Sequence, residues 1–249
     1  MKFALATLAA ALSAIALPTV VQAQAAPAAS VSYNVGLVTD YRYRGISQSR
    51  LDPALQGGAD YSNPNGVYLG TWLSTIKWTK DAGGGGDIEW DLYGGYKGEI
   101  AKDIGFDIGG LYYFYPSNKL GKVAGLANAN TFEIYGALTF GPVTAKYSHA
   151  LTNTFANIDS KNSGYLDLSA SFDLGNGFSL APHIGRQEIK GTPIAGYTDY
   201  SLTLGKDMGG GFSLSAALVG TDASKTFYVT PAGKFTGRNA LVLGAKFGF

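Results

Sequence analysis

The stretch Asn239-Ala-Leu-Val-Leu-Gly-Ala-Lys-Phe-Gly-Phe249 decides the fold of this chain. Its odd positions from Leu241 to Phe249 are apolar, and its even positions are mostly small or charged, as at Gly244 and Lys246. Successive side chains of a β-strand point to opposite faces. The stretch therefore predicts a strand with one apolar, aromatic face and one small or charged face.

The same alternation recurs along the chain after residue 30, and no helical period competes with it. In 164–174, for example, Leu166, Leu168 and Phe172 share one parity, and Asp167 and Ser169 share the other. About twelve strands are predicted, at 31–45, 53–62, 67–77, 88–98, 104–115, 130–140, 143–151, 164–174, 178–187, 199–208, 212–221 and 239–249.

The connections between these strands alternate in length. Short links with turn residues are expected at 63–66, 99–103, 141–142, 175–177 and 209–211, and longer ones at 46–52, 78–87, 116–129, 152–163, 188–198 and 222–238. Outer-membrane barrels have short periplasmic turns and longer outer loops, whereas a soluble β-sandwich has no reason to alternate in this way. We therefore predict an all-β fold, a transmembrane up-and-down antiparallel β-barrel of about 12 strands with periplasmic termini.

The N-terminus has the layout of a secretory signal peptide. Lys2 is basic, residues 3–17 are almost entirely apolar, and Val21-Gln22-Ala23 offers small residues at the cleavage spacing. The apolar run is shorter than the roughly 20 residues of a spanning helix. We predict a signal peptide at 1–23, a barrel domain at 24–249 and export to the cell outer membrane.

Composition narrows the function further. The chain has 35 Gly, 16 Tyr, 13 Phe and no Cys, and only 15% of its residues are charged. Glycines interleaved with aromatic residues suit a membrane barrel, with small residues in the lumen and aromatic residues at the interfaces. A net charge of +1 argues against a nucleic-acid partner. Two His and no Cys make a metal site improbable, and no cofactor is expected.

Several segments resemble known outer-membrane proteins. The aromatic end at Phe249 resembles the C-terminal signal that the barrel-assembly machinery recognises. The segments 39–48, 53–61, 66–74, 89–95, 112–116 and 133–135 resemble the TorF family of proteobacterial porins. The resemblance covers essentially the mature chain and is densest over 33–136. It implies an outer-membrane barrel with a transport role, and it brings no catalytic residues.

Strand parity predicts which charged side chains point into the lumen. The pore-lining candidates are Asp40, Arg42, Arg44, Glu89, Asp91, Glu133, Lys146, Asp167, Asp199, Arg238 and Lys246. The basic residues of the first and last strands would face acidic residues of the opposite wall, which predicts a transverse field. Arg42 and Arg44 either bind an anionic solute or pair with lumenal carboxylates and fill a narrow barrel, because buried charges need partners.

Two further groups are ambiguous. Most of the aromatics Trp72, Trp78, Trp90, Tyr112, Phe114, Tyr147 and Phe178 fit an interfacial girdle. The 67–77 strand is apolar on both faces, so parity does not decide whether Tyr68 and Trp72 face the lumen, where they would stack against sugars or nucleosides. His183 is expected in the lumen and His149 on the lipid face.

The sequence favours a porin-like narrow channel for passive diffusion of small hydrophilic solutes. One alternative is a plugged structural or surface-interaction barrel without transport. A membrane-embedded hydrolase is the weakest interpretation. Outer-membrane enzymes of this kind, which the lipid-facing His149 resembles, carry His-x-Ser on one strand, and here the residue two beyond His149 is Leu151. We therefore expect no enzyme. The expected partners are outer-membrane lipid and lipopolysaccharide, the barrel-assembly machinery and small solutes.

Overall fold

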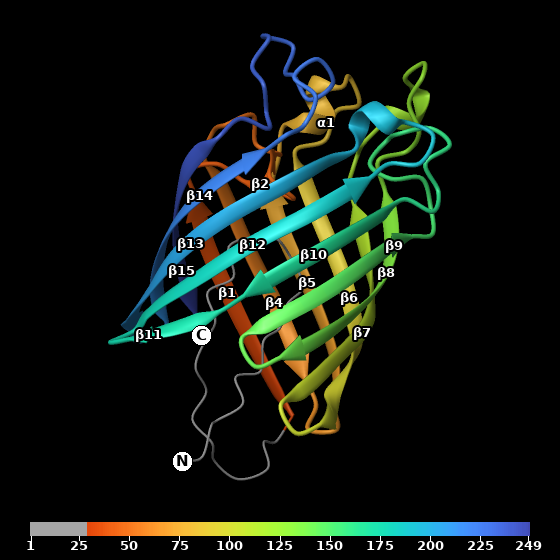
Figure 1. The fold of residues 1–249 in the computed structure, drawn as a ribbon. Coiled ribbons are helices and arrows are strands. Elements are labelled where there is room, and N and C mark those ends of the chain that lie inside the picture. The colour runs from red at the N-terminus through yellow and green to blue at the C-terminus, as the bar shows by residue number, and fades with distance from the viewer. Residues whose placement is uncertain (1–28) are drawn as a thin grey trace.

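The computed structural model describes residues 29–249, which form an antiparallel β-barrel (Figure 1). The predicted signal peptide and its cleavage site lie outside these residues. The strands of the wall are β1 (Ser30–Val38), β4 (Ala54–Ser62), β5 (Val67–Thr75), β6 (Ile88–Ala101), β7 (Ile104–Phe114), β8 (Thr131–Phe140), β9 (Val143–Ala150), β10 (Gly164–Ala170), β11 (Phe172–Gly175), β12 (Phe178–Glu188), β13 (Tyr197–Gly209), β14 (Phe212–Thr221) and β15 (Ala240–Gly248).

Apart from β10 and β11, consecutive strands of the wall pair with one another, and β1 pairs with both β4 and β15, which closes the sheet. β10 and β11 continue one another across Ser171, so the thirteen strands of this sheet occupy twelve positions in the described wall. β11 pairs only with β12 among the described strands, through an irregular register near Asp173. The predicted all-β, twelve-stranded barrel is confirmed.

The long and short connections gather at opposite ends of the barrel (Figure 1). The short ones, at 63–66, 102–103, 141–142, 176–177 and 210–211, define the turn end. The long ones, at 39–53, 76–87, 115–130, 151–163, 189–196 and 222–239, define the loop end. The long connections carry the short helices α1 (Trp78–Asp81), η1 (Leu120–Lys122) and η2 (Pro193–Ala195), none of which is long and apolar enough to cross a membrane.

The two faces of the wall differ in chemistry as the alternation predicts. Large apolar side chains project outward and are exposed, as at Leu69, Ile108 and Leu241. The inward positions carry small, polar or tyrosine side chains. Tyr68 and Trp72 both face inward and are buried. Trp72, whose side parity left open, packs in the lumen. The assignment of Trp78 to an outer girdle is wrong, because Trp78 belongs to α1 and packs edge-on against Tyr115.

Inward tyrosines lie over inward glycines of the neighbouring strand. Tyr68 is directly opposite Gly95, Gly70 is opposite Tyr93, and Gly109 is opposite Tyr135. A Cβ at Gly109 would lie 2.6 Å from the Tyr135 hydroxyl and 2.6 Å from the Gly94 carbonyl oxygen. An aromatic ring covering the glycine across from it is a known stabilising device in sheets. These three pairs therefore give part of the glycine and tyrosine content a shared packing role.

This packing predicts opposite effects of alanine at two glycines on the same pair of strands. Gly109→Ala should lower the free energy of unfolding by about 1–3 kcal/mol, because the new methyl group overpacks against Tyr135 and the backbone. Gly136→Ala, whose Cβ would meet nothing within 4 Å, should leave it unchanged or raise it by less than about 1 kcal/mol. Urea unfolding in micelles measures both, and equal effects would contradict the packing.

Candidate functional site

The chain leaves the barrel wall after Val38 and folds into the lumen. Val38 pairs with Ala54, so the wall continues without residues 39–53, which we call the inward segment. Within it, β2 (Arg42–Tyr43) and β3 (Ile46–Ser47) form a small hairpin, and every residue from 40 to 47 is buried. The prediction of one continuous strand over 31–45 is therefore wrong.

The turn of this hairpin explains why the strand does not continue. Arg44 and Gly45 have φ angles of 45° and 78°. Positive φ at both central residues is the type I′ geometry that joins two strands most tightly. Gly45 adopts it without strain, and the chain reverses direction inside the barrel.

Asp40 and Arg42 hold the inward segment together instead of lining the wall. The Arg42 Nε lies 2.6 Å from Asp40 Oδ2, and Ser47 Oγ donates to Asp40 Oδ1 over 2.5 Å. Arg42 Nη1 also donates to the carbonyl oxygens of Gly45, Thr236 and Arg238. These bonds attach the hairpin to the 222–239 connection. Pairing with a carboxylate, one of the two alternatives for Arg42, is what the structure shows.

Arg44 reaches the opposite wall. Its Nη2 and Nη1 donate to Glu133 Oε2 and Oε1 over 2.7 Å and 3.0 Å, and Nη1 donates to Gln187 Oε1 over 2.7 Å. Its guanidinium carbon lies 4.1 Å from the centre of the Tyr165 ring and 4.8 Å from that of Tyr43. Both charged side chains of the Arg44–Glu133 pair are 4% exposed. One basic and one acidic candidate from opposite parts of the barrel therefore meet in its interior.

Tyrosines complete the contacts of the inward segment with the wall. Tyr41 donates its hydroxyl to Glu89 Oε1 over 2.6 Å and packs edge-on against Trp72. Burial, and then the nearby Glu89 carboxylate, raise the pKa of the Tyr41 phenol well above its usual range, so it remains a donor. The hydroxyls of Tyr43 and Tyr113 are 2.6 Å apart. The rings of Trp72 and Tyr113 are thus covered by the inward segment.

The half of the lumen toward the turn end is less filled. Its inward side chains are half-buried, and they include Asp60, Lys97, Asp107, Lys146, Asp167, His183, Ser201 and Lys246. The Lys146 ammonium lies 3.9 Å from the centre of the Tyr135 ring. Tyr135 and Tyr68 share a hydrogen bond, and Tyr68 also donates to Asp107 over 2.6 Å.

His183 lies in the lumen, as predicted, between two carboxylates. Its Nε2 is 2.6 Å from Asp167 Oδ2, and its Nδ1 is 3.5 Å from Asp199 Oδ1. The Tyr165 hydroxyl donates to Asp199 Oδ2 over 2.9 Å. Through Tyr165 this cluster is continuous with the surroundings of Arg44. Among residues 29–249, no group of carboxylates and imidazoles is arranged to hold a metal ion.

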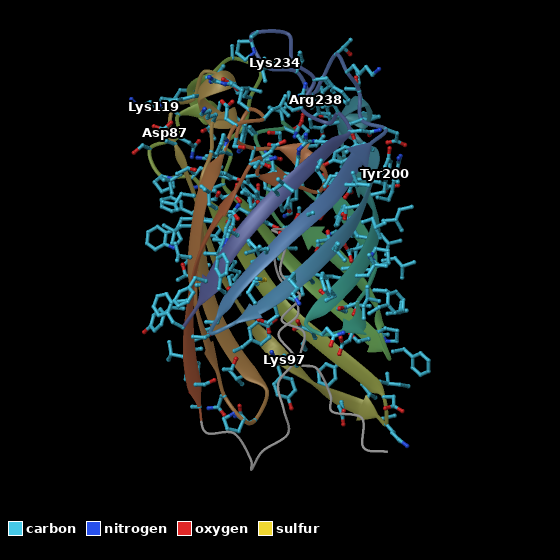
Figure 2. All side chains as sticks on the ribbon, turned by 90° about the vertical axis from the view of Figure 1, so that its left-hand side faces the viewer. Asp87, Lys97, Lys119, Tyr200, Lys234 and Arg238 are labelled. Atoms are coloured by element: carbon cyan, nitrogen blue, oxygen red, sulfur yellow. The ribbon has the colours of Figure 1, made fainter. Side chains whose placement is uncertain are left out.

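The remaining candidates divide into wall and loop residues. Glu89, Asp91, Glu133, Lys146, Asp167, Asp199 and Lys246 project inward from β6, β8, β9, β10, β13 and β15. Asp91 is fully buried, and neither of its carboxylate oxygens has a hydrogen-bond partner among the described residues. Arg238 is exposed at the loop end (Figure 2), before β15 begins, so its assignment to the last strand is wrong. That these residues line a conduction path stays a prediction.

Sequence reasoning missed Tyr43, Tyr165 and Gln187, which complete the surroundings of Arg44. One local signal was available. From Asp40 to Arg44, charged and aromatic residues alternate with no apolar aliphatic side chain, and Gly45 follows, which favours a turn over a lipid-facing strand. The partners on β10 and β12 gave no such signal, because they are distant in the sequence.

Comparison with known proteins places the chain in context. A model of the family described as "Bacterial protein of unknown function (Gcw_chp)" matches residues 22–249. No curated protein matches the chain. The structure of the KdgM porin in complex with disordered oligogalacturonate is similar, with a TM-score of 0.55 and 7% identity over 88% of this chain and 98% of that chain. The NanC porin is similar with a TM-score of 0.50 and 11% identity over the same shares. At these identities the likeness concerns the fold.

The buried Arg44–Glu133 pair predicts a marked loss of stability when one partner is removed. Arg44→Met should lower the free energy of unfolding by about 3–5 kcal/mol, because the Glu133 carboxylate stays buried without its cation. Arg50→Met is the matched control, since Arg50 pairs with Asp81 near the surface, where its side chain is 38% exposed. It should leave stability almost unchanged. Similar losses in the two variants, measured by urea unfolding, would contradict a buried pair.

Proposed function

We propose a channel function for this chain, which belongs to the Gcw_chp family of bacterial proteins. It forms an outer-membrane, porin-like narrow channel for passive diffusion of small hydrophilic solutes. In the conformation described above, the inward segment closes the loop half of the lumen.

One observation carries this proposal: the closure comes from a segment that is not part of the wall. Val38 and Ala54 pair directly, so the cylinder is complete without residues 39–53. Below the inward segment, polar side chains such as Lys97, His183 and Lys246 are half-buried. A polar lumen inside an outward apolar face is the arrangement of outer-membrane barrels.

We also propose that the barrel lies in the outer membrane. The turn end would face the periplasm and the loop end the outside, as in other outer-membrane barrels. The signal peptide would direct export, the outward face would meet lipid and lipopolysaccharide, and Phe249 would serve the barrel-assembly machinery. The main chain of Phe249 exchanges two hydrogen bonds with Tyr33, and their rings stack. The similarity to TorF porins agrees with this role.

We assign the channel no enzymatic activity. The His183 imidazole, a candidate general base, lies against the carboxylates of Asp167 and Asp199, and the Tyr165 hydroxyl is 3.1 Å from its Nε2. The imidazole is thus one member of a lumenal hydrogen-bond network with Asp167, Asp199 and Tyr165. Such a network suits the lining of a polar passage.

The alternative of a plugged structural barrel has one observation in its favour. Tyr41, Tyr43 and Arg44 hold the inward segment against three adjacent strands, β6, β7 and β8, and residues 40–47 are all buried. A segment held this firmly could stay in place permanently. The two functions therefore differ in whether the inward segment ever leaves.

Replacing residues 39–53 by Asn-Gly tests the proposal. The two-residue turn fits, because Val38 and Ala54 are paired neighbours. The variant should conduct continuously in planar bilayers, since the hairpin that lies across the loop half of the lumen is then absent. The unaltered protein should show brief openings to the same conductance.

Two results would decide against the channel. A variant without the inward segment that does not conduct would show that the wall side chains alone fill the lumen. A variant that conducts beside a native protein that never opens would favour the structural barrel. The correct fold of the variant is checked by its far-ultraviolet circular dichroism spectrum.

The proposed orientation predicts which end is accessible from outside the cell. The chain has no cysteine of its own, so single substitutions report cleanly. Cysteine at Lys119 or Lys234, both at the loop end (Figure 2), should react with an impermeant thiol reagent on intact cells. Cysteine at Lys102, in a short turn, should react only after permeabilisation. The reverse pattern would place the loop end in the periplasm.

A further inference from the structure

We infer that the wall residues around Arg44 form a binding site for a solute that carries a guanidinium group, and that Arg44 occupies this site as a tethered substitute. The route by which such a solute reaches the site rests on the proposed channel function. The site itself rests on the contacts of Arg44.

The geometry of these contacts is selective for a guanidinium group. Glu133 accepts two parallel hydrogen bonds from the two terminal nitrogens, over 2.7 Å and 3.0 Å. This fork-to-fork arrangement matches a planar guanidinium and not a compact ammonium. Gln187 accepts a further bond over 2.7 Å, and the Tyr165 ring lies 4.1 Å from the guanidinium carbon. Both terminal nitrogens of the cation are thus hydrogen-bonded, and an aromatic ring lies against its carbon.

The receptor belongs to the wall and does not depend on the inward segment. Glu133 is on β8, Tyr165 on β10 and Gln187 on β12. Other contacts of the wall hold these groups: the Tyr165 hydroxyl donates to Asp199, and Gln187 Nε2 donates to the Gly164 carbonyl oxygen over 3.0 Å. When Arg44 leaves, the three groups stay in position and an acidic, aromatic-walled pocket faces the lumen.

A purely structural role accounts less well for arginine at this position. A buried ion pair is often no more stabilising than apolar residues that fill the same space. Arg44 also has a φ of 45°, a conformation that glycine or asparagine adopts more readily in a type I′ turn. The burial of a charge and the unfavourable backbone conformation thus both occur at Arg44, the residue whose guanidinium pairs with Glu133.

Competition between solute and Arg44 links binding to opening. A tethered group competes with an effective concentration on the order of millimolar. A guanidinium solute must therefore be abundant to displace Arg44, and the weak net binding lets it leave toward the turn end. Displacement of Arg44 removes the cross-lumen contact of the hairpin tip, which favours release of the inward segment.

The test removes the tethered group and supplies a free one. Arg44→Ala in micelles, titrated calorimetrically with ethylguanidinium chloride, should bind it at least about tenfold more tightly than ethylammonium chloride, because the planar fork is matched. The double variant Arg44→Ala with Glu133→Gln should lose at least about tenfold in affinity for ethylguanidinium. An Arg44→Ala protein that binds both cations equally, or is unaffected by Glu133→Gln, would overturn the site.

Measurements on the native protein keep the inference testable if Arg44→Ala does not fold. In planar bilayers, ethylguanidinium chloride should raise the frequency of openings above that in ethylammonium chloride at equal ionic strength, and a protein that opens equally often in the two salts would overturn the site. The two proposals fail separately. A protein that conducts without this discrimination keeps its channel function and loses the site. A protein that binds ethylguanidinium in micelles and never conducts keeps the site and loses the channel.

Discussion

Backbone pairing between the first and last strands is the constraint on which the rest of this structure depends. An open sheet would leave a row of unpaired amide and carbonyl groups on β1 and on β15, and in lipid such groups find no partners. Pairing from Val38 with Gly244 to Asn34 with Gly248 removes both edges. Closure then separates an outward from an inward face, and strand parity assigns every wall side chain to one of them.

Closure also turns the lumen into a place where charge has to be neutralised. The wall brings Glu89, Asp91 and Glu133 inward at the loop half, where little water reaches them. The inward segment supplies the Arg44 cation to Glu133 and the Tyr41 hydroxyl to Glu89. Its second cation, Arg42, pairs with Asp40 of the same segment. Acidic wall and inward segment are therefore complementary parts. The inward segment of fifteen residues thus supplies partners to Glu89 and Glu133, two of the carboxylates that the wall presents.

The sequence predicts the wall well and the lumen poorly, for a physical reason. Strand number, pairing order and the alternation of loop lengths follow from local patterns, as in the Leu166–Asp167 alternation and the Asn63–Gly66 turn. The path of the inward segment is not predicted from the sequence, because parity applies only where a strand continues. Here the chain reverses direction at Arg44 and Gly45. Its partners lie about ninety to one hundred and forty residues further along, at Glu133 and Gln187, where only the closed barrel brings them near. The side of Trp72 is ambiguous in the sequence because both faces of its strand are apolar, and in the structure its ring faces inward and packs against Tyr41 of the inward segment.

The glycines opposite the inward tyrosines have a consequence for the calibre of the barrel. Because Gly95 and Gly109 have no side chain, the rings of Tyr68 and Tyr135 rest on the backbone instead of standing out from it. These aromatic side chains therefore extend only a short way from the wall into the lumen. Any side chain at these positions would act as a wedge under the ring and swing the phenol toward the barrel axis. Gly95 and Gly109 therefore keep the two phenol rings close to the wall and away from the barrel axis.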